Sequence, residues 1–433
     1  MNPPKPAPTA RRWNTLSTRI LLGLVVGLLS GAMLSGRPSP TLDLLLAVTA
    51  PIGQLWLDAL TMTVVPLVFG LLVTGVGSAT SSAAAGGVAA RAMMWFVVLL
   101  IAACALSAAL TTLVLAWAPI PAGGDVLRAP GLAPPVMAEA GAWFSGLIPA
   151  NPVKAAAEMS MAPLVVFSLF FGFAASRIEV HLRTSLMTFF EAVVATMLVI
   201  VRWVLLVGPL GVMALGFGVG AKMGLGAAGA LAHYVLIVVA ACLAITLAAY
   251  VLVALAGRIS PMTFARAALP VQVVALGTQS SLACLPAMMT ATSSLKTSPG
   301  SAEVVLPLSV SIFRAASAAA NIAVAVYLAH LHGVALSPAT LTVGVLIAAA
   351  VSLAAVGLPA QVSFFATIGP VCLAMGVPIA LLPVLLAIET IPDIFRTLGN
   401  VTTDLAVARI VGRPRGGAEP LADQREWPEP ASS

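Results

Sequence analysis

Five polar residues share one face of the last apolar segment of the chain, and their types could hold a charged solute or an ion. They are Glu389, Asp393, Arg396, Asn400 and Asp404. At roughly 100° per residue of an α-helix, their spacing places all five within an arc of about 80°. The residues around them are apolar, so this polar ridge must face protein or water. Inside a membrane such ionisable residues mark solute or ion paths. The alternative is a structural ion-pair ladder in which Asp393 pairs with Arg396.

The composition places that segment in a membrane. The chain has 433 residues, of which 60% are apolar and only 8% are charged, whereas soluble proteins carry about 25% charged residues. The mean hydropathy of +1.07 agrees. So few charges cannot cover a water-soluble body, which excludes soluble enzymes and nucleic-acid-binding proteins. The net charge of +6 is explained by basic residues at the ends of apolar segments, where they orient a chain in the membrane.

Other kinds of chemistry have little support in the sequence. The four cysteines each lie alone in an apolar run, and the four histidines form no cluster. This spacing predicts neither a disulfide framework nor a metal site, and we expect no cofactor. Neither an HExxH nor a GxSxG pattern occurs. A membrane enzyme with Ser281 or a cysteine as nucleophile is therefore a minor alternative.

The apolar segments predict eight membrane-spanning helices, because a helix that crosses a bilayer needs about 20 apolar residues. Most Lys and Arg residues fall on one side of this topology, whereas Arg37, Arg128 and Lys222 fall on the other. We therefore expect both termini on the cytoplasmic side of the cell (inner) membrane. The predicted spans are 17–36, 44–76, 89–119, 155–175, 187–219, 227–256, 304–330 and 376–408.

Two further stretches predict helical hairpins that enter the membrane and return. Residues 267–292 have a polar tip at 277–281, and residues 341–374 have a tip at 357–361. Each arm is too short to cross a bilayer, and each tip contains turn-forming residues. A hairpin followed by a full span, occurring twice, is how inverted-repeat transporters build a binding site at the midplane. Two kinked ordinary spans are the alternative.

Ordered motifs over residues 15–410 resemble those of the dicarboxylate/amino acid:cation symporters, the family that includes the glutamate transporters. Each motif is weak alone, but their order along the chain is specific. The motifs are Met62-Thr63-Val64-Val65-Pro66-Leu67-Val68-Phe69, Ile148-Pro149-Ala150-Asn151-Pro152, Thr278-Gln279-Ser280-Ser281, Gly357-Leu358-Pro359, and Asp393-Ile394-Phe395-Arg396-Thr397 followed by Asn400 and Asp404.

The resemblance implies an acidic solute with an amino group. Arg396 is similar to the residue that binds the solute's side-chain carboxylate. Asp393 is similar to the residue that holds the ammonium group, and Asn400 to one that binds the α-carboxylate. Aspartate or glutamate is then favoured over a C4-dicarboxylate, which would leave Asp393 unpaired. Further solute contacts are expected from Ser317 and from the hairpin tips, namely Gln279, Ser280, Ser281, Leu358 and Val362.

The sodium-binding motifs of the family are missing from this chain. Phe313-Arg314-Ala315-Ala316-Ser317 stands where the family has an Asn-Met-Asp-Gly-Thr run, and Leu99-Leu100 stands where it has a hydroxyl pair. Beyond Asn400 and Asp404 these positions offer no oxygen-bearing side chain. We therefore predict no complete sodium site, although a site made of backbone carbonyls stays possible. The coupling ion, H⁺ or Na⁺, is left open.

Arg314 and Glu389 are the two residues that could replace sodium in the coupling. We expect the Arg314 guanidinium to occupy the space of a sodium ion and to pair with Asp404. In a second interpretation, Arg314 anchors a solute carboxylate beside Ser317. Glu389 is a candidate proton carrier, because burial favours the neutral form of a carboxylate. A structural pair with another span is an equal alternative for Glu389.

The sequence thus predicts an all-α polytopic membrane protein that works as an elevator-type secondary transporter of aspartate or glutamate, with sodium coupling reduced or replaced by protons or exchange. Spans 1, 2, 4 and 5 would form a scaffold, by resemblance a homotrimer. Spans 3, 6, 7 and 8 and both hairpins would move. Residues 15–256 hold six spans and 257–412 the transport core, between disordered cytoplasmic tails at 1–14 and 413–433. The alternatives are a C4-dicarboxylate symporter and a non-transporting or channel-like homologue.

Overall fold

The computed structural model describes residues 16–35, 40–84, 86–121, 148–223, 226–354 and 360–413, and every regular element in these ranges is helical. The predicted all-helical class is therefore confirmed. Apart from Arg413, the predicted tails lie outside the described residues.

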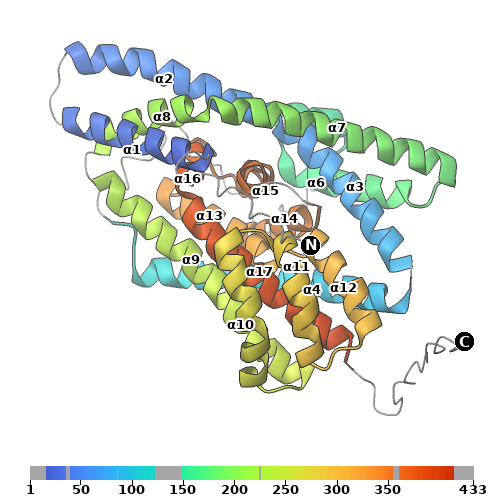
Figure 1. Ribbon diagram of the computed structural model, residues 1–433. Coiled ribbons are helices and arrows are strands. Elements are labelled where there is room, and N and C mark those ends of the chain that lie inside the picture. The colour runs from blue at the N-terminus through green and yellow to red at the C-terminus, as the bar shows by residue number, and fades with distance from the viewer. Residues whose placement is uncertain are drawn as a thin grey trace, which may run out of the picture.

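One group of helices forms a layer along one face of the molecule (Figure 1). The helices α1, α2, α7 and α8 run side by side there, and α3 and α6 pack at one end of the layer. The short helix α5 leads into α6. Their bounds are α1 (Leu16–Leu34), α2 (Pro40–Thr61), α3 (Val64–Ala84), α5 (Pro152–Ala157), α6 (Met161–Ala175), α7 (Val180–Leu206) and α8 (Gly208–Met223).

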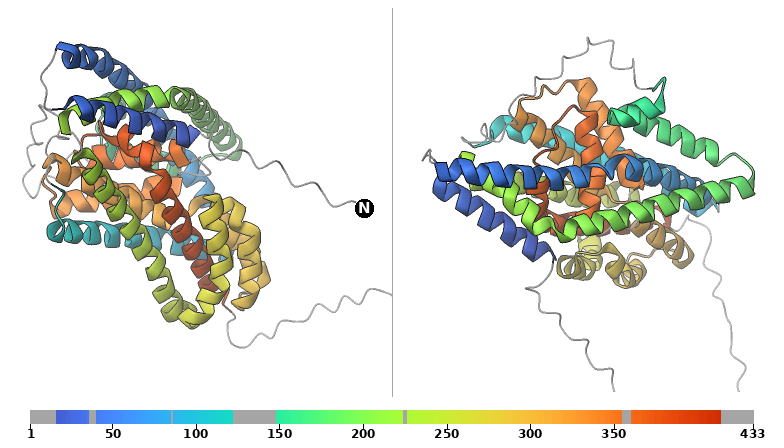
Figure 2. Two further views of the ribbon diagram at one scale, coloured as in Figure 1. Left: turned by 60° about the vertical axis from the view of Figure 1, so that its left-hand side comes forward. Right: turned by 90° about the horizontal axis from the view of Figure 1, so that it is seen from above.

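The second group of helices surrounds α13, whose side chains are almost all buried. This helix packs against α4, α9, α14, α15 and α17, and Figure 2 shows the group beneath the first layer. The bounds are α4 (Gly87–Trp117), α9 (Gly226–Leu252) with a π-turn at Val253–Gly257, α12 (Pro299–Ile312), α13 (Ala315–His332), α16 (Leu382–Ile388) and α17 (Thr390–Val411).

Five stretches among the described residues are long and apolar enough to cross a membrane. They are Pro40–Ser78, Gly87–Trp117, Val180–Leu206, Ala228–Gly257 and Pro299–His332. The outer faces of these helices carry large apolar side chains, such as Leu55 on α2 and Trp203 on α7, which are more than 60% exposed. A surface of this kind suits hydrocarbon rather than water.

Five of the predicted continuous spans are wrong in one respect, because each is divided into two helices. The divisions fall at Met62–Thr63, at Glu158–Ser160, at Val207, at Phe313–Arg314 and at Glu389. Pro66, Pro209 and Pro392 follow three of these breaks, and a proline removes a backbone donor and clashes with the carbonyl four residues earlier. The last span also begins later than predicted, at Leu382 instead of 376, because Gly376 has a positive φ of 70° that ends the preceding helix.

Both predicted hairpins are pairs of packed helices. The first joins α10 (Pro261–Thr278) to α11 (Ser281–Ser294), and the second joins α14 (Pro338–Ala354) to α15 (Ala360–Ala374). In the first tip, Gln279 adopts the left-handed conformation with a φ of 52°, and the Ser280 side chain accepts a hydrogen bond from the Ala283 N–H. Residues 355–359 of the second tip lie outside the described residues.

Glycines bring α1 and α8 into backbone contact. A Cβ atom at Gly27 would collide with the carbonyl oxygen of Met213, and one at Gly220 would collide with that of Leu28. Gly31 meets Phe217 in the same way. Without side chains at these positions the two helices approach closely, which is the packing that membrane helices use to gain van der Waals contact.

Candidate functional site

The polar ridge predicted on the last span begins at Glu389, between α16 and α17, and continues along α17. The exposed fractions are 4% for Glu389, 6% for Arg396, 3% for Asn400 and 0% for Asp404, and Asp393 is half-buried. The helix α17 packs against α9, α10, α12 and α13. The ridge therefore faces protein rather than lipid, one of the two environments that the sequence predicted.

Arg396 lies in a polar network that joins three helices. Its Nε lies 2.7 Å from Oε1 of Glu389, and its Nη1 donates a hydrogen bond of 2.8 Å to Oδ1 of Asn321 on α13. The amide nitrogen of Asn321 in turn lies 3.4 Å from the hydroxyl of Ser352 on α14. Because Glu389 and Arg396 are both buried, each charge depends on the other, and removal of one would leave the other uncompensated.

Asn400 and Ser317 are brought into direct contact. The Asn400 side-chain oxygen accepts hydrogen bonds from the backbone N–H groups of Ala316 (3.0 Å) and Ser317 (3.2 Å), and its amide nitrogen donates to the Ser317 hydroxyl at 2.9 Å. The first N–H groups of a helix have no partner within the helix, so Asn400 caps α13 from α17. Gly399 permits this approach, because a Cβ atom there would collide with Ala316.

Arg314 and Asp404 face the same region, but they do not form the expected direct ion pair. Both carboxylate oxygens of Asp404 are buried and have no well-formed hydrogen bond among the described residues, although the Ser309 hydroxyl acts on this carboxylate. Nε of Arg314 is likewise buried without a hydrogen-bond partner there. The Arg314 charge acts on both Asp404 and Asp393 from beyond ion-pair distance. The physical reason is the break before α13: Arg314 is the residue that precedes the helix, and its charge acts on both carboxylates instead of pairing with one.

Asp393 is the most accessible ionisable group of the ridge. It is half-buried, whereas its neighbours on the ridge are buried, and the charges of Arg396 and Arg314 both act on it. A carboxylate in this position can take a cationic group of a solute while a guanidinium lies close by.

The predicted hairpin-tip residues have local roles in the structure. Gln279 ends α10 and Ser280 caps α11, and Ser281 is the first residue of α11. Across the described residues, no hydrogen bond joins these three to the polar ridge. The pair α10–α11 is instead tied to α17 by Gln272, whose amide nitrogen donates to the hydroxyls of Tyr250 and Thr402, each at 3.0 Å. Leu358 and the side chain of Val362 lie outside the described residues.

Apolar side chains occupy the region beside the break in the seventh span. The ring of Phe313 is stacked on Phe96 of α4, with ring centroids 4.7 Å apart and planes at 11°. Leu100 on the same helix is buried in the core, and Leu99 packs against that core. Phe313, Leu99 and Leu100 stand where the family that the chain resembles has oxygen-bearing side chains, and here they contribute only hydrocarbon.

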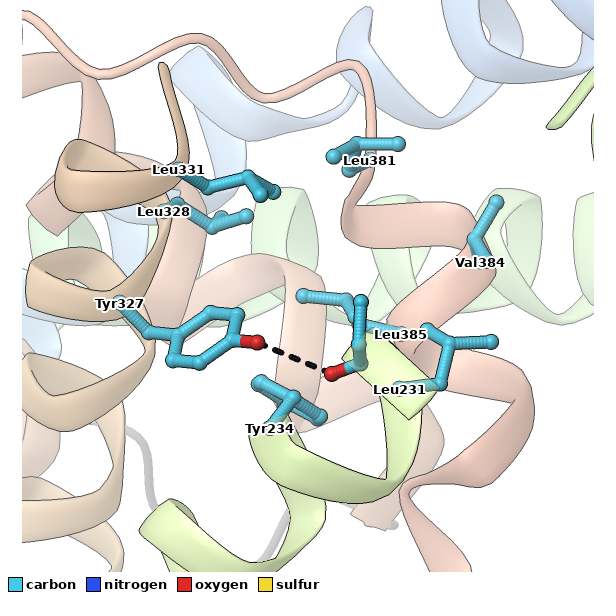
Figure 3. Close-up of a pocket in the computed structure, with 9 residues that line it drawn as sticks. Leu231, Tyr234, Tyr327, Leu328, Leu331, Leu381, Val384 and Leu385 are labelled. Carbon is cyan, nitrogen blue, oxygen red and sulfur yellow. Dashed lines mark hydrogen bonds between the residues drawn. The ribbon is translucent and has the colours of Figure 1, made fainter. Parts of the chain in front are cut away.

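A small cavity lies near Glu389 but does not include the predicted site residues. It measures about 10 Å³ and is lined by apolar side chains together with Tyr234 and Tyr327. Figure 3 shows Tyr327 beside it, with its hydroxyl donating to the Ala230 carbonyl at 2.9 Å. This volume corresponds to one water-sized molecule, so this cavity is not an amino-acid site. Tyr234 also interacts with Glu389.

Sequence reasoning missed Asn321, Ser352 and Gln272. Asn321 is an isolated polar residue in a run of alanine and aliphatic residues, and this isolation is a signal that could have identified it. Ser352 and Gln272 have no such signal, because serine and glutamine are common on helices that face other protein.

The comparisons with known proteins agree with the resemblance seen in the motifs. The family described as "Sodium:dicarboxylate symporter family" matches residues 16–413. The proton/glutamate-aspartate symporter of Escherichia coli (strain K12) is 26% identical over 409 residues, which cover 92% of each chain. The proton/sodium-glutamate symport protein of Bacillus subtilis (strain 168) is 26% identical over 418 residues, which cover 94% of each chain. With a match that extends from α1 to the end of α17, the chain belongs to the sodium:dicarboxylate symporter family of secondary transporters.

Proposed function

We propose that this protein is a secondary active transporter of acidic amino acids, aspartate or glutamate above all. The observation that carries the proposal is the pair Arg396 and Asp393, a guanidinium and a carboxylate on one face of α17 within the protein. An acidic amino acid can place its side-chain carboxylate against the Arg396 guanidinium and its ammonium group against the Asp393 carboxylate. Both relatives are named for glutamate. Membership of a symporter family removes the membrane-enzyme alternative.

The coupling in this chain depends less on sodium than the family description suggests. Phe313 and Phe96 fill the region beside the helix break with rings, and Arg314 places a fixed positive charge there that disfavours a second cation. Asp404 is fully buried and has no well-formed hydrogen bond in the described structure, and a buried carboxylate in this state is costly as an anion. A proton on Asp404 removes that cost without further oxygen ligands. Both relatives have the proton in their names.

The two groups of helices support the division into a scaffold and a transport domain. The layer of α1, α2, α7 and α8, together with α3 and α6 at its end, would form the fixed scaffold of a homotrimer. The group around α13, with both helix pairs, would carry the solute between the two sides. In this arrangement eight spans and two re-entrant hairpins lie in the cell (inner) membrane, and both termini are cytoplasmic.

A counterflow experiment tests the transport function without an ion gradient. Purified protein is reconstituted into liposomes that contain unlabelled L-aspartate, and the entry of labelled L-aspartate is followed with equal sodium and proton concentrations on both sides. We expect transient accumulation that unlabelled L-glutamate abolishes. Competition by succinate but not by L-glutamate would identify a C4-dicarboxylate transporter, and binding without accumulation would identify a non-transporting homologue.

A further inference from the structure

Asn321 occupies an unusual position for a polar side chain. It is 1% exposed, and its neighbours along α13 from Ala318 to Ala325 are alanine, isoleucine and valine. A buried amide without partners costs free energy comparable to a lost hydrogen bond or more. Asn321 avoids this cost because Arg396 on α17 and Ser352 on α14 supply its partners. The amide is therefore matched to these two side chains.

The two ends of the Asn321 amide have different partners. Its oxygen accepts from Nη1 of Arg396 at 2.8 Å, and its nitrogen lies 3.4 Å from the Ser352 hydroxyl. An asparagine amide could be turned by 180°, which would place its NH₂ group against the guanidinium, a contact between two donors. Because the guanidinium has no acceptor, it fixes the orientation in which the amide oxygen faces Arg396, and the Ser352 hydroxyl then accepts from the amide nitrogen.

Two of the three guanidinium nitrogens of Arg396 are thereby engaged. Nε lies at ion-pair distance from Glu389, and Nη1 donates a hydrogen bond to Asn321. Nη2 is buried and has neither an ion-pair nor a hydrogen-bond partner among the described residues. Glu389 is on the same chain segment as Arg396, but Asn321 comes from α13. Asn321 therefore determines the rotation of the guanidinium relative to the helix that Asn400 caps.

We propose that Asn321 is a positioning residue for the solute: by holding Nη1 of Arg396 it aims the rest of the guanidinium at the solute's second carboxylate, and so sets the preference for acidic over neutral solutes. The proposal rests on the proposed function, in which Arg396 binds that carboxylate. Asn321 does not touch the solute. Its removal leaves the charge of Arg396 in place but allows the guanidinium to turn.

The test compares a carboxylate with an amide of the same shape. Displacement of labelled L-aspartate by unlabelled L-aspartate or L-asparagine is measured on the full-length protein in nanodiscs. Wild type is expected to prefer L-aspartate. In Asn321→Leu, we expect the Kd for L-aspartate to rise on the order of tenfold, the value for one hydrogen bond to a charged group. The Kd for L-asparagine should change little, so the preference for L-aspartate over L-asparagine falls. Ser352→Ala should shift the preference in the same direction by less.

Ser107→Ala is the matched control. It removes another buried hydrogen bond to α13, which the Ser107 hydroxyl donates to the Ala319 carbonyl at 2.6 Å, without touching Arg396. This variant should lose stability but keep the preference. If Asn321→Leu and Ser352→Ala both keep the preference for L-aspartate over L-asparagine, while Arg396→Lys abolishes it, the positioning role of Asn321 is overturned. The proposed function would still stand in that case. A wild type that does not bind L-aspartate would overturn the proposed function as well.

Discussion

The side-chain oxygen of Asn400 lies 3.0 Å from the backbone nitrogen of Ala316, so a residue of α17 caps the N-terminus of α13. This contact fixes the broken seventh span against the polar ridge. It also brings Arg314, which precedes α13, close to the carboxylates of the ridge. The geometry of the candidate site therefore depends on Asn400 before any solute binds.

Removal of the Asn400 cap should destabilise the solute-free protein. Asn400→Ala loses the acceptor for two backbone donors, and loss of a helix cap typically costs about 1 kcal/mol or more. We expect a lower thermal unfolding temperature in detergent. Asn400→Asp keeps an acceptor at the same place and should retain most of the stability. Equal unfolding temperatures for Asn400→Ala and wild type would show that the cap contributes nothing.

The ion pair of Glu389 and Arg396 should have separable effects on stability and on transport. Arg396→Met leaves the buried Glu389 carboxylate uncompensated, which typically costs about 3–5 kcal/mol. The double variant Arg396→Met with Glu389→Gln removes that charge and should recover much of the folded protein, measured as monodisperse protein after size-exclusion chromatography. L-aspartate uptake should not recover. Recovered uptake in the double variant would exclude Arg396 as the carboxylate ligand.

The Arg314 charge should suppress the sodium dependence of uptake. In Arg314→Met, the fixed cation that acts on Asp404 and Asp393 is lost, so a mobile cation is needed to balance these carboxylates. We expect L-aspartate uptake by this variant to become stimulated by sodium. The exposed Arg266 on α10 provides the matched control, because Arg266→Met also removes one positive charge, but from an exposed position. If the sodium dependence of Arg314→Met equals that of wild type, Arg314 does not substitute for an ion.

The backbone contact between α1 and α8 should be intolerant of larger residues. Gly27→Leu places a side chain where the Met213 carbonyl lies, and overpacking of this kind typically costs about 1–3 kcal/mol. We expect a lower unfolding temperature and a lower yield. Gly218→Ala on α8 is the control, because a Cβ atom there meets no atom within 4 Å. A wild-type unfolding temperature for Gly27→Leu would show that the two helices can separate without cost.

Local patterns in the sequence were sufficient to predict the helical class, the two helix pairs and the ridge on α17. The ridge follows from the helical period, and the pairs follow from arm length and from turn formers such as Gly277 and Ser280. Breaks at Val207 and at Met62–Thr63 were missed although Pro209 and Pro66 signalled them. In those segments the continuous hydrophobicity favours one long span, whereas the missing backbone donor of each proline favours a break.

The contacts that hold the site together could not be predicted in the same way. Asn321 and Arg396 are 75 residues apart in the chain, and Asn400 and Ala316 are 84 apart. No periodicity within one helix indicates which partner a buried amide finds on another. The direct pair of Arg314 and Asp404 does not form for a related reason: the distance between them depends on where α12 ends and α13 begins, and the cap of α13 comes from Asn400 on another helix.

The most direct measurement is L-aspartate uptake into proteoliposomes driven by a proton gradient in sodium-free buffer, compared with uptake driven by a sodium gradient at equal pH on both sides. If Arg314 and Asp404 replace a sodium-dependent coupling, the proton gradient alone should drive accumulation of L-aspartate. In Asp404→Asn, the accumulation of L-aspartate should no longer depend on the proton gradient. Strict dependence on sodium in the wild type, with no accumulation under the proton gradient, would contradict this coupling.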